Sequence, residues 1–127
     1  AARHRGEGHR RAWSARFAQR DSAGLAAIYR EDALLYGSGD SLLVGRKAIE
    51  GYFAALPAEG AASARFDDVT RLDLSATTAA IAATVRFAIG VVTLSMRITL
   101  TFVERNGIWQ IGVHHASMPM SPETLSR

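Results

Sequence analysis

Two adjacent histidines, His114 and His115, are the side chains of this sequence best suited to move a proton near neutral pH. They lie in the segment GIWQIGVHHASMP, whose residue pattern predicts a β-strand. Because neighbouring residues of a strand point to opposite faces of a sheet, the two imidazoles cannot enter one pocket or jointly bind one metal ion. We therefore expect the two histidines to have different roles.

A long cation stands among small side chains at Arg86. On its expected strand Arg86 shares a face with Thr84 and several alanines, while larger apolar residues occupy the opposite face. This pattern indicates that the guanidinium of Arg86 has free space beside it, where it could hold a carboxylate or another anionic group of a ligand. Two structural alternatives stay open, namely an internal ion pair with Asp32 or Glu31, or a solvent-exposed face.

Three further polar residues are candidates for substrate binding. Arg97 lies on the polar side of its strand, a side that faces a pocket, water or a dimer partner. Tyr36, near a predicted hairpin, could donate a hydrogen bond to an enolate oxygen or simply pack. Asp32, at a helix-to-strand junction, could act as a base or be solvated at the helix end. Asp67 and Asp68 point to opposite faces and form no carboxylate pair.

Helical spacing dominates the first half of the sequence, which must position these groups. Trp13 and Phe17 stand four residues apart and predict a helix over 11–20. Asp21 and Ser22 can cap a second helix that buries Leu25, Ile28 and Tyr29. The segment ALLYGSGDSLLV predicts a strand, a turn and a strand, and GRKAIEGYFAALP predicts a third helix that ends at its proline.

From residue 66 onward the sequence is typical of strands. Four strand segments are expected: RFDDVTRLDLS, TAAIAATVRFAIG, VVTLSMRITLTFVE and IWQIGVHHAS. The third alternates apolar and polar residues from Thr93 to Phe102, and Asn106-Gly107 predicts a hairpin between the last two strands. Helices followed by antiparallel strands predict an α+β fold whose sheet buries one face against the helices.

Composition narrows the class of protein. The 127 residues are 48% hydrophobic and 21% charged and contain no cysteine, which suits one soluble domain in the cytoplasm. No apolar run reaches the ~20 residues of a membrane-spanning helix. The net charge of +3 lies entirely in residues 1–11, because the remaining chain holds 11 basic and 11 acidic residues, so we expect no nucleic-acid partner.

The same distribution of charge suggests the boundaries of the domain. Residues 1–11 are expected to be a disordered or cloning-derived basic tail, because they show no apolar periodicity. Residues 12–120 should form a single domain. Residues 121–127 should form a C-terminal tail.

The order helix, helix, short hairpin, helix and four strands resembles the nuclear-transport-factor-2-like superfamily over residues 13–119. The local matches to its SnoaL-like, bacterial SgcJ/EcaC-type and kinase-association-domain-like members are WSARFAQRDSAGLAAIYREDALL, GRKAIEGYF and ERNGIWQIGVHHASMP. The resemblance implies a cone-shaped, curved antiparallel sheet wrapped around three helices, a cystatin-like α/β roll with an internal pocket. It also implies a homodimer formed through the sheet.

The resemblance implies that His114 lies on the face of the last strand that lines the pocket. His114 is therefore the catalytic candidate, and a structural role is also open. His115, Trp109 and Ser117 would share the opposite face and serve structure or a dimer contact, because most such histidines are satisfied by a hydrogen bond. Arg86 matches a pocket arginine of the kinase association domains.

The superfamily includes ketosteroid isomerases, polyketide cyclases, dehydratases and non-catalytic association domains, so the activity rests on the site residues. Thr99 stands near the position of the proton-sharing aspartate of the isomerases, which argues against steroid-isomerase chemistry. We expect a pocket that binds a small, partly apolar molecule of polyketide or steroid type, either anionic or neutral, with no metal or redox cofactor. Isomerisation, cyclisation or dehydration would then use His114 and Arg86. The alternative is a non-catalytic ligand-binding or association module.

Overall fold

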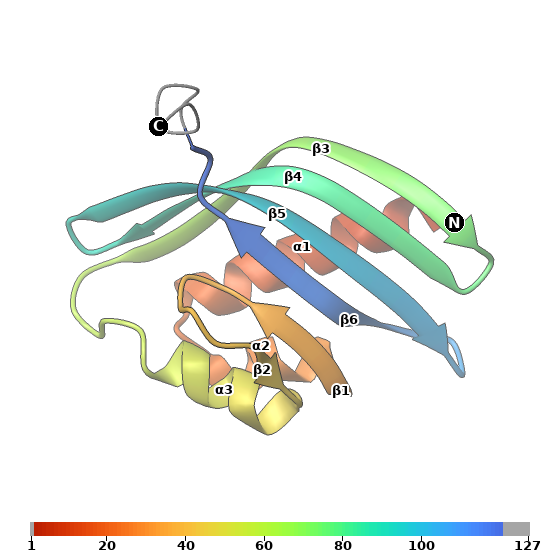
Figure 1. The fold of residues 1–127 in the computed structure, drawn as a ribbon, viewed down its shortest axis with the longest axis horizontal. Coiled ribbons are helices and arrows are strands. Elements are labelled where there is room, and N and C mark those ends of the chain that lie inside the picture. Colours follow the sequence, from red (N-terminus) through yellow and green to blue (C-terminus); the bar gives the residue numbers. More distant parts are fainter. Residues whose placement is uncertain (1, 121–127) are drawn as a thin grey trace.

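The structure, a computed structural model, describes residues 2–120, and the side chains of residues 8–120. Figure 1 shows helices and a long sheet that follow one another in the order expected from the sequence. The elements are α1 (Ala2–Ala18), α2 (Ser22–Ala27), β1 (Tyr29–Tyr36), β2 (Leu43–Val44), α3 (Arg46–Ala54), β3 (Ala62–Ser75), β4 (Thr78–Ile89), β5 (Val92–Arg105) and β6 (Ile108–Ser117).

The strands form one curved sheet in the order β2-β1-β6-β5-β4-β3. All neighbouring strands are antiparallel except β1 and β6, which run parallel. This pair corrects the expectation of a purely antiparallel sheet. Parallel neighbours need a long connection, and here α3 and four strands, β2 to β5, lie between β1 and β6 in the chain.

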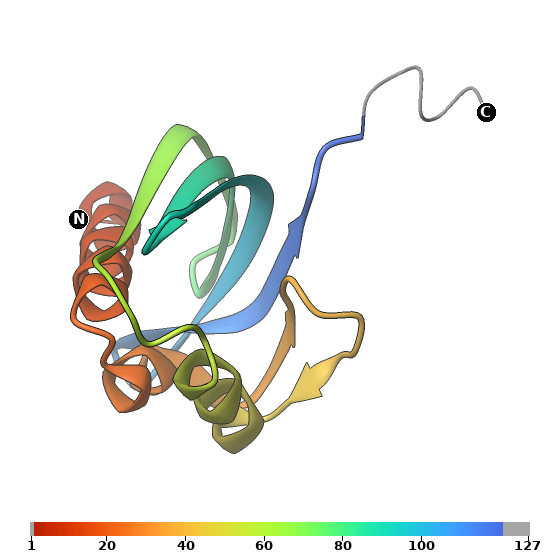
Figure 2. The ribbon, with the colours of Figure 1, turned by 90° about the vertical axis from the view of Figure 1, so that its left-hand side faces the viewer.

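The helices lie on the concave side of the sheet. In Figure 2 the sheet curls, with α1 along one side and α2 and α3 beneath it. Trp13 and Phe17 of α1 stack with ring centroids 5.3 Å apart, and both are buried with Leu25, Ile49 and residues of β4 to β6. Each such side chain contributes roughly 1.5–3 kcal/mol on leaving water. The predicted α+β fold, a curved sheet wrapped around three helices, is confirmed.

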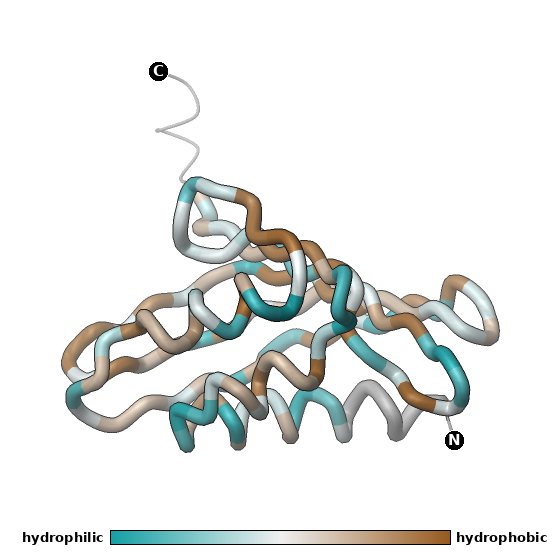
Figure 3. The backbone as a smooth tube through the Cα atoms, turned by 90° about the horizontal axis from the view of Figure 1, so that it is seen from below, coloured by the Kyte–Doolittle hydropathy of each residue, from teal (hydrophilic) through white to brown (hydrophobic). Residues whose placement is uncertain are grey.

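Apolar and polar residues alternate along the elements, so each element has one buried and one open face. Figure 3 shows this as frequent changes between brown and teal along the tube. In β5, Met96, Ile98 and Leu100 are buried while Arg97 and Thr99 are exposed. The period of two that predicted this strand therefore also selects its core face.

The first helix is longer than the sequence predicted. It begins at Ala2, so residues 2–11, expected to be a disordered or cloning-derived tail, are helical in the structure. The side chain of His9 explains the difference, because its Nε2 donates to the carbonyl oxygen of Trp109 at 2.7 Å. Its ring also meets Phe102 at 5.3 Å. The expected tail over residues 121–127 lies outside the described residues.

A bulge in β6 changes which side chains face the core. Thr101 of β5 pairs with Val113 and Phe102 pairs with Ile111, so Gly112 is an extra residue in β6. Before the bulge Trp109 and Ile111 are buried, and after it His114 and Ala116 are buried. The expectation that Trp109 shares a face with His115 is therefore wrong.

The turns follow the chemistry of their residues. The side chain of Asp21 accepts a hydrogen bond from the backbone N–H of Gly24 at 2.9 Å and caps α2. Asn106 and Gly107 have φ of 55° and 79°, as a tight hairpin turn between β5 and β6 requires. None of the helices in the described part of the chain is long and apolar enough to cross a membrane.

Candidate ligand pocket

A cavity of about 80 Å³ lies between the helices and the concave face of the sheet. Its lining residues come from α1, the segment after β1, α3 and strands β4 to β6: Trp13, Phe17, Gly37, Ser38, Tyr52, Phe53, Leu56, Phe87, Ile89, Val92, Leu94, Met96, His114 and Ala116. The lining is almost entirely apolar, and none of these residues carries a carboxylate. A water molecule needs about 10–15 Å³ by this measure, so the cavity has room for roughly five to eight non-hydrogen atoms.

His114 belongs to a buried chain of hydrogen bonds. The indole N–H of Trp13 donates to the hydroxyl oxygen of Tyr29 at 2.9 Å, and this hydroxyl lies 2.8 Å from Nδ1 of His114. Because an indole can only donate, Tyr29 accepts from Trp13, and its own proton has Nδ1 as its acceptor. This arrangement assigns the tautomer of His114 in which Nδ1 accepts and Nε2 carries the proton.

Burial keeps both titratable members of this chain neutral. Desolvation, helped by the nearby charge of His115, lowers the pKa of His114 to about 3. Desolvation likewise raises the pKa of the Tyr29 hydroxyl above its ordinary value, although the hydrogen bond from Trp13 opposes this rise. An imidazole that is neutral throughout the physiological range is a weak base, and it can donate a hydrogen bond through Nε2.

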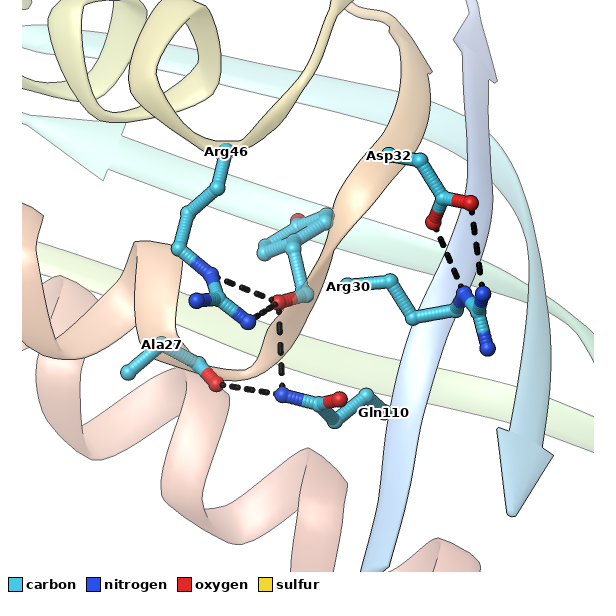
Figure 4. A network of polar contacts seen from close by, with 6 residues as sticks. Ala27, Arg30, Asp32, Arg46 and Gln110 are labelled. Atoms are coloured by element: carbon cyan, nitrogen blue, oxygen red, sulfur yellow. Dashed lines mark hydrogen bonds and ion pairs between the residues drawn. The ribbon is translucent and has the colours of Figure 1, made fainter. Parts of the chain in front are cut away.

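The backbone of Tyr29 is held by side chains from α3 and β6. Its carbonyl oxygen accepts hydrogen bonds from Nε and Nη2 of Arg46, at 3.0 and 2.7 Å. Gln110 reaches the same oxygen at 3.5 Å and the carbonyl oxygen of Ala27 at 3.3 Å. Figure 4 shows these side chains meeting where α2 ends and β1 begins. They fix the strand that presents the Tyr29 hydroxyl to His114.

A second polar group borders the cavity near the segment that follows β1. The hydroxyl oxygen of Tyr52 lies 2.8 Å from the Ser38 hydroxyl and accepts the backbone N–H of Ser38 at 3.0 Å. A Cβ atom at Gly37 would lie 2.5 Å from the same oxygen, so only glycine allows this approach. Ser38 and Tyr52 both line the cavity, and Tyr52 of α3 supplies the aromatic hydroxyl that was expected from Tyr36.

Arg86 does not reach the cavity. On β4 the core face carries Ile81, Val85, Phe87 and Ile89, and Arg86 lies on the convex face, exposed to solvent. The sequence predicts the small-residue face as the pocket wall, but the larger apolar side chains are the ones that pack against the helices. Of the structural alternatives, the solvent-exposed face is the one observed, and Arg86 forms no ion pair with a described residue.

The other three expected substrate-binding residues also lie outside the cavity. Tyr36 is 41% exposed and its ring meets that of His115 at 5.3 Å. Arg97 is exposed on the convex face and donates to the hydroxyl of Ser117 at 3.3 Å. Asp32 accepts from Arg30 at 2.8 and 3.2 Å, as Figure 4 shows. The hydrogen bond from Arg30 lowers the pKa of Asp32.

The convex face collects the residues assigned to structure or assembly. His115 is exposed beside Thr99 and Arg97, as the alternation of the strand predicted. Ser117 lies on the same side, whereas Trp109 lies in the core. A shallow groove on this face is lined by Ala82, Ala83, Arg97, Ile98, Thr99, His115 and Ser117. Among the described residues, no cluster of three histidines or carboxylates could hold a metal ion.

The curved sheet over three helices, with a partly open cavity bordered by one histidine of β6, defines a cystatin-like α+β roll. The chain belongs to the SnoaL-like domain family, whose profile matches residues 10–121. None of the curated proteins matches this chain. The chain's membership agrees with the resemblance to the nuclear-transport-factor-2-like superfamily.

Solved structures with the same fold have different described functions. An NTF2-like protein of unknown function from Pseudomonas putida has a TM-score of 0.84 at 20% identity, over 97% of this chain and 90% of that chain. A proposed calcium/calmodulin-dependent protein kinase II association domain from Xanthomonas campestris has a TM-score of 0.75 at 24% identity, over 87% of this chain and 81% of that chain. A proposed scytalone dehydratase from Novosphingobium aromaticivorans has a TM-score of 0.79 at 17% identity, over 90% of this chain and 81% of that chain. Identities this low show the fold alone.

Proposed function

We propose that the cavity binds a small, largely apolar molecule that carries an oxygen acceptor, and that Nε2–H of His114 donates a hydrogen bond to this oxygen. The observation that carries the proposal is the chain from Trp13 through Tyr29 to His114, which orients a neutral imidazole beside an apolar cavity. Nε2 has no hydrogen-bond partner among the described residues and is not sealed from solvent. It is therefore free to meet a ligand.

The part of the ligand that enters this cavity is uncharged. The lining contains no cation and no carboxylate, so an ionic group placed there would lose its hydration without a counter-charge. A carbonyl or hydroxyl oxygen would lose only weak hydration and would regain a hydrogen bond from His114. This favours ketones, phenols or lactones over compounds that are charged at this end.

If the protein is an enzyme, His114 acts as a hydrogen-bond donor to an enolate-like oxygen. This role suits isomerisation, cyclisation or dehydration, in which negative charge develops on a carbonyl oxygen. A proton-transfer role is less suitable, because an imidazole with a pKa of about 3 is a weak base. The dehydratase descriptions of structurally similar proteins are in keeping with such chemistry.

The test combines binding with a direct observation of the tautomer. We expect cyclohexanone to bind the wild type by calorimetry, and His114→Phe to weaken binding about tenfold through the lost hydrogen bond. His115→Phe on the opposite face is the matched control and should bind as the wild type does. Nitrogen NMR at neutral pH should show His114 with Nδ1 unprotonated. Equal affinity in the two variants, or a proton on Nδ1, contradicts the proposal.

Assembly through the convex face is a second candidate function. No described helix covers this face, and Leu34, Tyr36 and Val113 are each about two-fifths exposed on β1 and β6. Apolar side chains exposed together are typical of an interaction surface, and a homodimer is the partner we propose. Light scattering tests this directly: a dimer that Val113→Glu converts to a monomer supports it, and a wild-type monomer at high concentration contradicts it.

A further inference from the structure

A second cavity, of about 250 Å³, lies beside the first. It is bounded by the end of α1, by α2 and α3, and by the segment between α3 and β3: Phe17, Arg20, Ser22, Leu25, Phe53, Ala54, Leu56, Ala58, Ala62 and Ile89. Four of these residues, Phe17, Phe53, Leu56 and Ile89, also line the first cavity. The two cavities are therefore separated only by side chains that border both.

The shared wall has a fixed part and a movable part. Phe17 and Phe53 are 5% and 8% exposed, and both pack on Trp13 with ring centroids 5.3 and 5.8 Å away. Leu56 lies in the turn that follows α3, where its backbone N–H donates to the carbonyl oxygen of Phe53 at 3.3 Å. Its side chain packs against the core but is only half-buried, so it is less confined than the two phenylalanines. A change of rotamer at Leu56 needs no movement of the sheet or the helices.

The outer wall of the second cavity is pinned in place by Arg20. Its guanidinium donates to the carbonyl oxygens of Pro57, Glu59 (3.2 Å) and Gly60 (2.7 Å). Gly90 donates from its backbone N–H to the carbonyl oxygen of Ala61 at 2.9 Å. These bonds hold residues 57–61 against α1 and the turn between β4 and β5.

Two glycines allow the close packing of this wall. A Cβ atom at Gly60 would lie 2.5 Å from Cα of Gly90, and the two residues have φ of 81° and 61°. The backbones of the two segments are thus in direct contact, a packing that only glycine permits. The second cavity is bounded by a fixed wall rather than by a loose loop.

Arg20 also gives the second cavity a charge that the first lacks. Among the described lining residues of the two cavities it is the one cation. It forms no ion pair with a described residue, and its Nε–H makes no hydrogen bond to one. A carboxylate at the edge of the cavity can accept this N–H and offset the charge.

We infer that the two cavities are compartments of one elongated site, joined when Leu56 turns aside, which takes an apolar carboxylic acid with a carbonyl or hydroxyl oxygen at its far end. The inference rests on the proposed function: the far oxygen meets His114 in the first compartment, and the carboxylate meets Arg20 in the second. Cavities of about 80 and 250 Å³ together reach the lower end of the ~300–1,000 Å³ typical of pockets for drug-sized ligands.

The inference is tested with methyl-ketone acids of increasing length, from 4-oxopentanoate to 11-oxododecanoate, in calorimetric titrations. The long acid should bind the wild type at least about tenfold more tightly than the short one, because its chain buries more apolar surface. Leu56→Trp, which fills the passage, should remove this gain, and the volume-matched Leu56→Met should keep it. Affinity that does not depend on length, or a gain that survives in Leu56→Trp, overturns the inference.

Arg20 is tested with the same long probe and its methyl ester. Arg20→Gln should weaken the acid about fivefold more than the ester, since both lose the same wall contacts but only the acid offers a charge to an exposed guanidinium. Arg20→Lys should restore most of the affinity for the acid, which separates loss of charge from loss of the loop contacts. Equal weakening of acid and ester, with an unchanged melting temperature, contradicts the role of Arg20.

Cyclohexanone separates the two proposals, because it is small enough to report on the first compartment. Binding of cyclohexanone that depends on His114, without any gain for the longer acids, defeats the elongated site and keeps the proposed function. Failure of every probe to bind, cyclohexanone included, defeats both. Melting temperatures of all variants, measured without ligand, show that each remains folded.

Discussion

His114 and His115 are neighbours in the chain, yet the structure gives them opposite surroundings. His114 is 4% exposed on the concave face, hydrogen bonded to Tyr29 and bordering the apolar cavity. His115 is exposed on the convex face, where its ring meets Tyr36 and the side chains nearby are small or polar. The face of the strand on which a histidine lies, and not the type of residue, therefore determines which chemical role it can have.

The same contrast holds along the neighbouring strand. On β5 the concave side carries Met96, Ile98 and Leu100, which the helices cover, while the convex side carries Arg97 and Thr99. A group on the concave side loses its water and must find partners within the protein. A group on the convex side keeps its water, so its pairings contribute little to stability or to ligand binding.

The largest effect should come from emptying the concave side of β5. Ile98 is 2% exposed, so Ile98→Ala removes buried methyl groups and leaves a cavity, which should lower the free energy of unfolding by about 2–5 kcal/mol. Thr99→Ala, one residue further along, should change it by less than about 0.5 kcal/mol. Urea unfolding measures both. Similar losses in the two variants would contradict the division between the faces.

The next effect should come from the hydrogen-bond chain. Tyr29→Phe removes the hydroxyl and leaves the indole N–H of Trp13 and Nδ1 of His114 buried without partners, which should destabilise the protein by about 2–4 kcal/mol. Tyr36→Phe is the matched control on the convex side and should be nearly neutral. Urea unfolding of both variants tests this, and the chain carries no stability if the two changes have the same effect.

The sequence was sufficient for most of the fold, because periodicity reports burial directly. It predicted the three helices, the long strands and the hairpin at Asn106, and it placed His114 and His115 on opposite faces. It failed at Trp109, because the extra residue at Gly112 shifts the alternation and a bulge leaves no clear mark in a single sequence. It also failed at Arg86, because the size of neighbouring side chains does not by itself tell a pocket wall from an open face.

The partners of the site were harder to predict than its strand. Tyr29 and His114 are 85 residues apart in the chain, and they meet only because β1 pairs with β6 in parallel. Tyr52 reaches the cavity from α3, where its helical spacing indicated packing alone. No spacing rule in the sequence links a tyrosine such as Tyr29 or Tyr52 to a strand as distant in the chain as β6.

The pH dependence of stability should report the neutral His114. Burial lowers its pKa to about 3, whereas in the unfolded chain the pKa returns to about 6.5. Below pH 6.5 the imidazole binds a proton in the unfolded state but stays neutral in the folded state. The free energy of unfolding therefore falls as the pH decreases toward 3. At pH 5 the protonation of this group in the unfolded state should lower the free energy of unfolding by about 2 kcal/mol. Above pH ~6.5 this loss is absent.

Urea unfolding at several pH values separates this group from the others. His114→Gln should show a shallower loss of stability between pH 6.5 and 4, because glutamine binds no proton. His115→Gln, on the opposite face of the same strand, is the control for the substitution itself. Groups other than these histidines titrate equally in all three proteins and cancel in the differences. Parallel curves for the wild type and His114→Gln would show that His114 titrates normally in the folded state.

The smallest effects should come from the arginines of the convex face. Arg86→Ala and Arg97→Ala remove exposed cations that do not border the ligand cavity, so each should change the free energy of unfolding by less than about 0.5 kcal/mol and leave the affinity for cyclohexanone unchanged. Arg97 also lines the groove beside His115, where a partner subunit would cover it. A change in the oligomeric state of Arg97→Ala, seen by light scattering without any change in ligand affinity, would assign binding to the concave face and assembly to the convex one. Weaker ligand binding in either variant would show instead that the two faces are coupled.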